Sequence, residues 1–287
     1  MTAIIQVGDL HLRDRPMFNS LLVKLFGFHA TLHHGDALVW DRWRWLQRRV
    51  RQTHNADRLL DIGCGSGAFT IGMAKRGYLS LGLSWDARNQ GVARQRADIC
   101  GATNATFEIC DVRQLHERTD LFGMFDIILC CENIEHIIDD FLLMKSMAAC
   151  LKPGGRLLLT APYIRRIPQS SMDYGPFPDF EDGRHVRRGY GRAMIAELCV
   201  HSGLTIEEIS YVSGPISQAI AFLLERLGRR VHPLFGWLVV LPLRPLPPVL
   251  DKLLTQIFGL TPFCIGLEAY KPRQPRPFVM ENPAVAV

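Results

Sequence analysis

From residue 58 onward, the chain alternates between two kinds of segment. Short runs of leucine and β-branched residues end in glycine or polar turns, and most of these turns lead into longer amphipathic stretches. The short runs predict strands and the longer stretches predict helices. The predicted strands cover 58–62, 78–83, 106–110, 125–131 and 156–161, with helices near 67–76, 87–100 and 139–151. Because strands that alternate with helices form right-handed βαβ crossovers, we predict a doubly wound α/β domain with a mostly parallel sheet.

Regions on both sides extend this pattern. In 1–52, apolar residues recur at helical spacing with arginines between them, which predicts a helical cover ahead of the main domain at 53–274. Two further strands are predicted at 205–212 and 262–270, and the segment 214–261 between them is predicted to be an apolar helical insertion. We therefore expect one domain with additions at its N-terminus and before its last strand.

The insertion combines an amphipathic helix at 215–230 with a strongly apolar stretch at 234–250. A membrane-spanning helix needs about 20 consecutive apolar residues, whereas one arginine and four prolines interrupt this stretch. It therefore does not predict a span. Its apolar residues and the nearby Arg226, Arg229 and Arg230 predict either peripheral contact with a membrane or a lid or dimer interface over the sheet edge.

Composition bears on compartment and partners. The 287 residues, 48% hydrophobic and 21% charged, are typical of a globular chain, and we expect only the Pro-rich residues 275–287 to form a flexible tail. The eight cysteines form no C-x-x-C pair, and the start of the chain lacks a signal-peptide pattern, so we expect a cytoplasmic protein, with peripheral membrane contact as a further possibility. The net charge of +5 includes arginine clusters, such as 42–51 and 184–192, that fit solvated helix faces or an anionic partner.

The first predicted strand runs into Asp-Ile-Gly-Cys-Gly-Ser-Gly, which contains Asp61, Gly63, Gly65 and Gly67. Glycine allows a tight turn here and lets a ligand lie directly against the backbone. The D-x-G-x-G-x-G spacing differs from the G-x-G-x-x-G turn of nicotinamide-binding folds, and it suits an amino-acid moiety better than a pyrophosphate. This turn therefore predicts a cofactor site.

Three more features follow in order: Asp111 after the third strand, Glu-Asn-Ile-Glu-His at 132–136, and Leu-Lys-Pro-Gly-Gly-Arg at 151–156. With the glycine turn, they resemble class I S-adenosylmethionine-dependent methyltransferases. They are particularly similar to the ubiquinone and menaquinone biosynthesis methyltransferases and their small-molecule relatives. The resemblance implies a Rossmann-like, seven-stranded sheet with an antiparallel last strand, and S-adenosylmethionine as the cofactor.

The resemblance also implies roles for individual residues. The three glycines would line the methionine and ribose parts of the cofactor, and Asp61 would orient its amino group. Asp111 would accept a hydrogen bond from the adenine amino group, with Val112 as the adjoining backbone contact.

The chain departs from the family pattern at the end of the second strand. The family usually has an acidic residue there to bind the ribose hydroxyls, whereas this chain has Ser84. We expect Ser84, with Asn89 or Gln90, to replace that acid, and Asp86 to be either a further cofactor contact or the N-cap of the next helix. Glu132, after the fourth strand, is placed with the cofactor-binding residues.

Methyl transfer is an in-line displacement from a sulfonium cation, so the protein supplies alignment and desolvation. An oxygen or carbon acceptor also needs a base, and the candidates are His136 and His185, because imidazole titrates near pH ~6.5. Glu132 and Glu135 could orient that base or hold a divalent ion, although no metal site is assigned. Further candidates for the acceptor pocket are Tyr163, Tyr174 and Arg187.

These features predict S-adenosylmethionine-dependent methyl transfer to a small, lipophilic or membrane-associated acceptor, with O- or C-methylation favoured. A nucleic-acid-modifying enzyme is the first alternative. It is disfavoured because Cys-Glu-Asn-Ile stands where amino-directed enzymes of this superfamily carry an Asn/Asp-Pro-Pro-Tyr/Phe motif. The other alternative is a cofactor-binding protein without catalytic activity. The sequence contains no signal for the acceptor's identity or for an oligomeric state.

Overall fold

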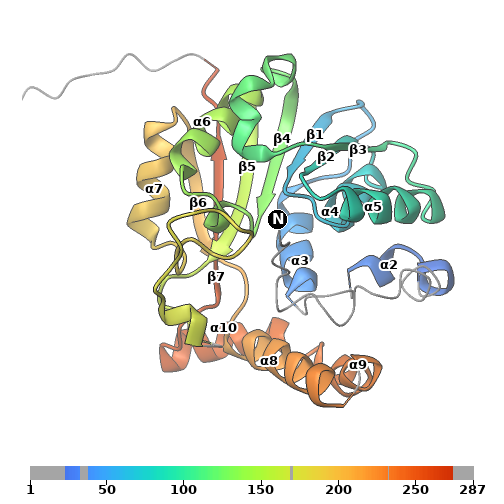
Figure 1. Cartoon of the computed structure of the whole chain (residues 1–287), viewed down its shortest axis with the longest axis vertical. Helices are drawn as coiled ribbons and strands as arrows, with labels where there is room; N and C mark the ends of the chain where they lie inside the picture. Colours follow the sequence, from blue (N-terminus) through green and yellow to red (C-terminus); the bar gives the residue numbers. More distant parts are fainter. Residues whose placement is uncertain (1–22, 33–37, 169–170, 232, 274–287) are drawn as a thin grey trace, which may run out of the picture.

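A seven-stranded sheet forms the centre of the molecule (Figure 1). The computed structural model describes residues 23–32, 38–168, 171–231 and 233–273. The strand order is β3-β2-β1-β4-β5-β7-β6; neighbours among β1 to β5 are parallel, and β7 is antiparallel to both of its neighbours. The predicted sheet with an antiparallel last strand is confirmed. The bounds are β1 (Arg58–Ile62), β2 (Leu79–Ser84), β3 (Ala105–Ile109), β4 (Phe125–Cys131), β5 (Leu151–Pro162), β6 (Thr205–Tyr211) and β7 (Cys264–Tyr270).

Helices cover both faces of the central strands. Successive side chains of a strand alternate between faces, so Leu59 of β1 joins one hydrophobic cluster and Leu60 joins another. Burial on both faces explains why these strands are almost continuously apolar in sequence. One face packs against α3 (Val39–Arg49), α4 (Ala68–Ala74) and α5 (Ala87–Ile99), and the other against α6 (Asp140–Cys150) and α7 (Arg192–His201).

The carboxyl ends of the central strands lie at one edge of the sheet. Ile62 of β1 pairs with Cys130 of β4, and Cys130 pairs with Leu159 of β5. Residues that directly follow these three strands therefore meet at this edge, which is where doubly wound sheets bind ligands.

The N-terminal cover is helical where it is described, in α2 (Phe28–Thr31) and α3. Trp43 of α3 packs edge-on against Phe28, with ring centroids 5.2 Å apart, and stacks on Phe69 at 6.4 Å. A Cβ at Gly72 would lie 2.4 Å from the Trp43 ring, so glycine there permits the close approach of α3 to α4. The predicted helix before residue 23 and the tail at 275–287 lie outside the described residues.

Most predicted elements differ from the observed ones by one or two residues, but β5 begins five residues earlier than expected. The Lys-Pro-Gly-Gly segment, predicted as a turn, is part of the strand: Phe125 pairs with Leu151, and the register shifts before Ile127. Gly154 has a φ of +86°, and its N–H donates to the carbonyl of Lys271 at 2.7 Å. The Lys-Pro-Gly-Gly segment is therefore held in an extended conformation by pairing with the residues after β7, although the sequence alone predicts a turn there.

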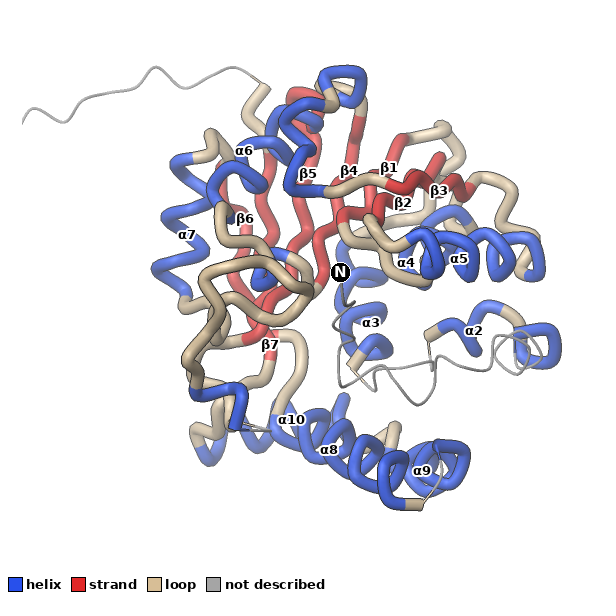
Figure 2. The backbone as a smooth tube through the Cα atoms, in the orientation of Figure 1, coloured by secondary structure: helices blue, strands red, loops and turns tan. Residues whose placement is uncertain are grey.

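The 214–261 insertion consists of α8 (Pro215–Arg230), α9 (Pro233–Val240), the 3₁₀ helix η5 (Leu241–Leu243) and α10 (Pro247–Phe258), which lie together at one end of the molecule (Figure 2). Ile220 and Leu224 of α8 pack against Val240 of α9. Among the described residues, no helix is long and apolar enough to cross a membrane.

One carboxylate joins two helices of the insertion. Asp251 of α10 accepts hydrogen bonds from the N–H groups of Gly214, Ile216 and Ser217 at 3.1, 2.6 and 3.2 Å, and from the Ser217 hydroxyl at 2.6 Å. It thereby satisfies the free N–H groups at the start of α8 and complements the helix dipole, in the way an N-cap residue does.

Replacement of Asp251 is expected to loosen the insertion. Because Asp251→Ala removes the cap of α8, we expect the free energy of unfolding to fall by about 1–2 kcal/mol, measured by urea denaturation. The neighbouring exposed Lys252→Ala is the matched control and should change it by less than about 0.5 kcal/mol. Equal stability of the two variants would contradict the capping role.

Candidate active site

The turn after β1 has the open, left-handed backbone that a ligand-binding glycine turn needs. Gly63, Gly65 and Gly67 have φ values of +71°, +51° and +80°, a region that favours glycine. A Cβ at Gly63 would lie 2.3 Å from the Asn133 side chain, whereas a Cβ at Gly65 would meet nothing within 4 Å. The backbone at Gly65 therefore faces open space in which a ligand could lie.

Asp61 is a buried carboxylate directly before this turn. Its Oδ2 accepts a hydrogen bond from the Thr70 hydroxyl at 2.6 Å, and its side chain is almost fully inaccessible. Burial raises the pKa of Asp61 from 3.8 to about 7, because the loss of water outweighs the hydrogen bonds from Thr70. A buried carboxylate of this kind fits an incoming ammonium group, such as that of an amino acid.

The structure brings Ser84 and Gln90, but not the Asp86 carboxylate, to the turn. Asp86 is the N-cap of α5 and accepts from the N–H groups of Arg88 and Asn89 at 2.8 and 3.3 Å. Gln90 is fully buried and donates to Cys64 Sγ at 3.4 Å, while its Oε1 has no hydrogen-bond partner among the described residues. An unpaired buried acceptor beside the turn fits a hydroxyl-bearing ligand.

Two features near the predicted cofactor site were not foreseen. Trp85, directly after β2 and next to Ser84, is 68% exposed. Asp111 is engaged by Arg113, whose Nε lies 2.8 and 2.9 Å from its two oxygens, and these hydrogen bonds lower the pKa of Asp111. Val112, which is buried, begins the 3₁₀ helix η1 (Val112–Glu117).

Glu132 follows β4 in a strained conformation for a residue with a side chain, with φ of +51°. Its Oε2 lies 3.3 Å from Nη2 of Arg42, a buried side chain of α3. In the sequence, Arg42 belongs to an arginine cluster that fits a solvated helix face or an anionic partner. Nothing in its local pattern distinguishes it from its neighbours, because only the packing of α3 on the sheet brings it to Glu132.

Glu135, His136 and His185 form a compact group beyond β4. His136 and Glu135 belong to the 3₁₀ helix η3 (Ile134–His136), whereas His185 arrives from a distant loop whose Val186 N–H donates to the Glu135 carbonyl at 3.0 Å. Nε2 of His136 and of His185 lie 4.0 and 3.9 Å from Glu135 Oε1, and the two rings meet edge-to-face at 4.7 Å. The sequence predicted both histidines but not their contact.

Burial controls the charge of this group. It strongly raises the pKa of Glu135, whose two oxygens have no hydrogen-bond partner among the described residues. It also lowers the pKa of His136, and burial together with the nearby His136 lowers that of His185 to about 3. Neutral imidazoles at pH 7 can accept a proton or bind a metal ion, and one ligand atom from each of the three residues lies within 4.8 Å of the others.

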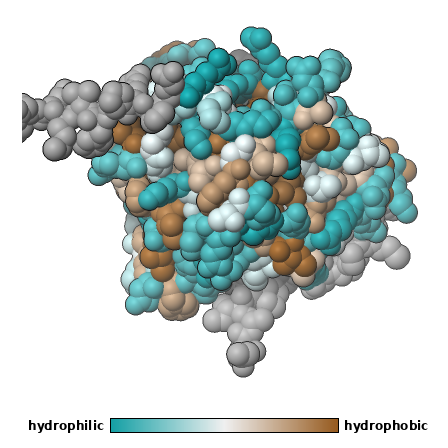
Figure 3. All heavy atoms as spheres, turned by 90° about the horizontal axis from the view of Figure 1, so that it is seen from above, coloured by the Kyte–Doolittle hydropathy of each residue, from teal (hydrophilic) through white to brown (hydrophobic). Residues whose placement is uncertain are grey.

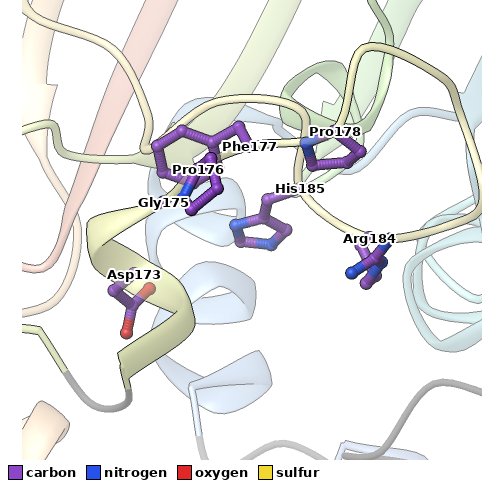
Figure 4. A pocket seen from close by; sticks show the side chains of 7 residues that line it. All are labelled: Asp173, Gly175, Pro176, Phe177, Pro178, Arg184 and His185. Carbon is purple, nitrogen blue, oxygen red and sulfur yellow. The ribbon is translucent and has the colours of Figure 1, made fainter.

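A cavity of about 400 Å³ opens beside His185 (Figure 4). The figure shows its imidazole between Pro176 and Arg184, and the walls are mostly apolar. The lining residues are Asp173, Gly175, Pro176, Phe177, Pro178, Arg184 and His185.

The side chains expected to line an acceptor pocket do not line this cavity. Arg187 instead forms an ion pair with Asp140 and donates to the carbonyl of Ile137 at 2.7 Å, which fastens the loop. The ring of Tyr163 packs against that of Tyr211 at 5.3 Å, and Tyr174 is 72% exposed. The sequence carried no signal for the residues that do line the cavity, because they lie in a long loop whose position depends on tertiary contacts.

The burial of Asp61 generates a test of stability against pH. Because the pKa of Asp61 is about 7 in the folded state and about 3.8 when unfolded, stability is lost as pH rises through this window. We therefore expect Asp61→Asn to increase the free energy of unfolding at pH 8 by about 2–4 kcal/mol and to have little effect near pH 4.

The control for this measurement is Asp57→Asn. Asp57 also accepts from a threonine hydroxyl, that of Thr53 at 2.6 Å, but it lies nearer the surface. Urea denaturation at both pH values should show no stabilisation for the control. An Asp61→Asn variant that is less stable than wild type at pH 8 would contradict the conclusion that burying the ionised Asp61 carboxylate destabilises the fold.

Comparisons with known proteins identify the family. A family model described as a methyltransferase domain matches residues 34–209. Ubiquinone biosynthesis O-methyltransferase of Acinetobacter baumannii is 27% identical over 202 residues, which cover 64% of this chain and 83% of the relative. The protein of the same name from Marinobacter nauticus is 30% identical over 181 residues, covering 61% and 73%.

Solved structures agree on the fold. A geranyl diphosphate methyltransferase in complex with S-adenosylmethionine matches with a TM-score of 0.56 at 13% identity, and the match covers 87% of this chain and 90% of that one. The glycine turn, the buried Asp61 and the unpaired Gln90 oxygen all fit this cofactor. The chain belongs to the methyltransferase-domain family and is an S-adenosylmethionine-dependent methyltransferase.

Proposed function

We propose that this methyltransferase methylates an oxygen, or alternatively a carbon, of a small lipophilic acceptor bound in the cavity beside His185. The observation that carries the proposal is the group of Glu135, His136 and His185, which lies between this mostly apolar cavity and the sheet edge that carries the glycine turn. The names of the curated relatives, ubiquinone biosynthesis O-methyltransferases, support an O-methylated small molecule.

We propose that the residues at the carboxyl ends of β1, β2 and β3 bind the cofactor. Gly63, Gly65 and Gly67 line the methionine and ribose, and Asp61 holds the amino group. Ser84 and Gln90 take the place of the missing acid at the ribose, while Asp86 and Asn89 serve mainly to begin α5. Asp111 and Val112 contact the adenine, which requires Arg113 to share or release the Asp111 carboxylate.

The bound cofactor supplies an electrophilic methyl group on a sulfonium, so the protein must position the acceptor and remove its proton. We infer that His185, which lines the cavity, takes the proton of the acceptor hydroxyl on Nε2. The Glu135 carboxyl group, 3.9 Å from that nitrogen, is kept neutral by burial, and it orients the imidazole as a polar neighbour. The imidazole of His136 packs edge-to-face against the imidazole of His185 and helps to fix its orientation.

A divalent ion bound by Glu135, His136 and His185 is the alternative use of this group. An ion there would lower the pKa of an acceptor hydroxyl by direct coordination, so no protein base would be needed. Removal of the ion by a chelator would then abolish activity, whereas a base mechanism would be unaffected.

The ion pairs of the arginine clusters support a small-molecule acceptor over nucleic acid. Arg42 pairs with Glu132, Arg49 with Glu208 and Glu268, and Arg187 with Asp140. These cations are therefore already neutralised within the protein and cannot all contact phosphates. Peripheral contact of 214–261 with a membrane is proposed as the way in which a lipophilic acceptor is reached.

The cofactor turn is tested by Gly65→Arg. Because the Gly65 backbone faces open space at the turn, an arginine should fill the cofactor site and weaken S-adenosylmethionine binding at least 100-fold in calorimetric titration. Gly101→Arg is a matched control, since Gly101 also has positive φ, +63°, and open space around it. Similar losses in both variants would mean that general strain, not the site, is responsible.

The catalytic group is tested with labelled S-adenosylmethionine and a panel of phenols, quinols and lipid hydroxyls. We expect His185→Ala to lower kcat by about 10²–10⁴, the usual contribution of a general base. Glu135→Ala, which removes the polar group that orients the imidazole, should lower kcat by less, and neither variant should weaken cofactor binding. His116→Ala is the control, because His116 also lies near a glutamate, Glu117, but on the surface. Unchanged kcat in both site variants would refute the role of the group, and loss of activity with a chelator would favour the metal alternative.

A further inference from the structure

The insertion carries a disproportionate share of the exposed apolar surface. Of the 24 large apolar side chains exposed among the described residues, ten lie in 214–261. Exposed apolar patches of this kind mark a contact with another molecule or with lipid. The family model ends at residue 209, so this segment lies outside the range that it matches.

The exposed residues of α9 and η5 follow a helical stripe. Phe235, Leu238 and Leu241 are three residues apart and are 47%, 70% and 52% exposed. Gly236 and Val240, on the other side, are buried against α8. The chain thus buries one face of this helix and leaves an equally apolar face uncovered. Five more exposed apolar side chains lie in and beside α10, namely Leu246, Leu253, Ile257, Phe258 and Leu260, and with those of α9 and η5 they make up what is called the apolar face below.

The charges of the insertion are mostly positive. Arg226 and Arg230 of α8 and Lys252 of α10 are exposed, and the guanidinium of Arg226 lies over the Phe222 ring. Only two carboxylates occur in 214–261, and that of Asp251 is directed inward to the start of α8. Exposed apolar side chains accompanied by cations are the pattern of an element that lies on an anionic lipid surface.

The insertion also lies at the same end of the sheet as the active site. It enters after Tyr211 of β6 and leaves at Cys264 of β7, which pairs with Pro162 at the carboxyl end of β5. The Gln218 side chain of α8 donates to the carbonyl of Ile167, in the segment that leads to the cavity loop. At the opposite end of the molecule, hydrophilic residues spread over much of the surface (Figure 3).

We propose that the apolar face docks on an anionic lipid bilayer without crossing it, with the active-site end toward the lipid. A lipophilic acceptor could then pass from the bilayer to the cavity without entering water. This second part rests on the proposed function, whereas lipid docking itself does not depend on catalysis. A second copy of this chain is the competing occupant, because an apolar face could also be covered by an identical one.

The test is co-sedimentation of the full-length chain with vesicles of phosphatidylcholine, with and without one quarter phosphatidylglycerol. We expect binding to the anionic vesicles, at least a tenfold loss in a Leu238→Asp/Ile257→Asp double variant, and a weaker loss in Arg226→Ala/Arg230→Ala that grows with salt. Val200→Asp is the control for added charge, because Val200 is 59% exposed on α7, outside the insertion. Calorimetric binding of S-adenosylmethionine verifies that each variant is folded.

Three results would overturn the proposal. The first is equal sedimentation of wild type and the double variant, and the second is no sedimentation of the wild type at low salt. The third is a dimer in light scattering that the double variant dissociates, which would assign the apolar face to contact between copies.

A separate assay distinguishes docking from catalysis. Methyl transfer to a water-soluble phenol should persist in the double variant, while transfer to a phenol carried in vesicles should fall. A chain that binds vesicles but methylates nothing contradicts the proposed function and leaves lipid docking supported.

Discussion

The alignment of parallel strand ends is the constraint on which the rest of this structure depends. Because β1, β4 and β5 are buried on both faces, their register is determined by packing, and Ile62, Cys130 and Leu159 lie side by side. The glycine turn and the group after β4 therefore share one edge without any direct bond between them. The helix that carries Arg42 and the loop that carries His185 pack at this same edge, where Arg42 meets Glu132 and His185 meets Glu135.

Two carboxyl groups near that edge lie in surroundings that disfavour their ionised form. Asp61 and Glu135 are both buried, and burial raises the pKa of both. Among the described residues, Asp61 has no ion-pair partner, and Glu135 has only His136 and His185, 4.0 and 3.9 Å away. Uncompensated buried acids destabilise a fold unless a ligand or substrate supplies the missing charge. Both lie where a ligand could supply that charge, Asp61 beside an open glycine turn and Glu135 beside a residue that lines a cavity.

Helix α3 connects this edge to the insertion. Arg42 pairs with Glu132 at the site, while the adjacent Asp41 lies 3.3 Å from the Ser213 hydroxyl, directly before α8. Burial raises the pKa of Asp41, and nearby Arg244 of the insertion lowers it. One short helix therefore contacts both Glu132 and the start of the insertion, which gives the N-terminal cover a positioning role beyond shielding the sheet.

The sequence by itself determined the strand and helix order, the glycine turn and the helical nature of 214–261, because these depend on periodicity and on local backbone requirements. It left two roles open for Asp86, of which the structure shows the N-cap. It did not indicate the extended Lys-Pro-Gly-Gly segment, the buried Arg42, or the contact of His185 with Glu135. Each of these depends on residues far apart in the chain, and no local pattern records which partner a side chain will meet. The tertiary structure also decided which apolar residues of the insertion stay exposed, since burial depends on the face that α8 covers and not on hydrophobicity alone.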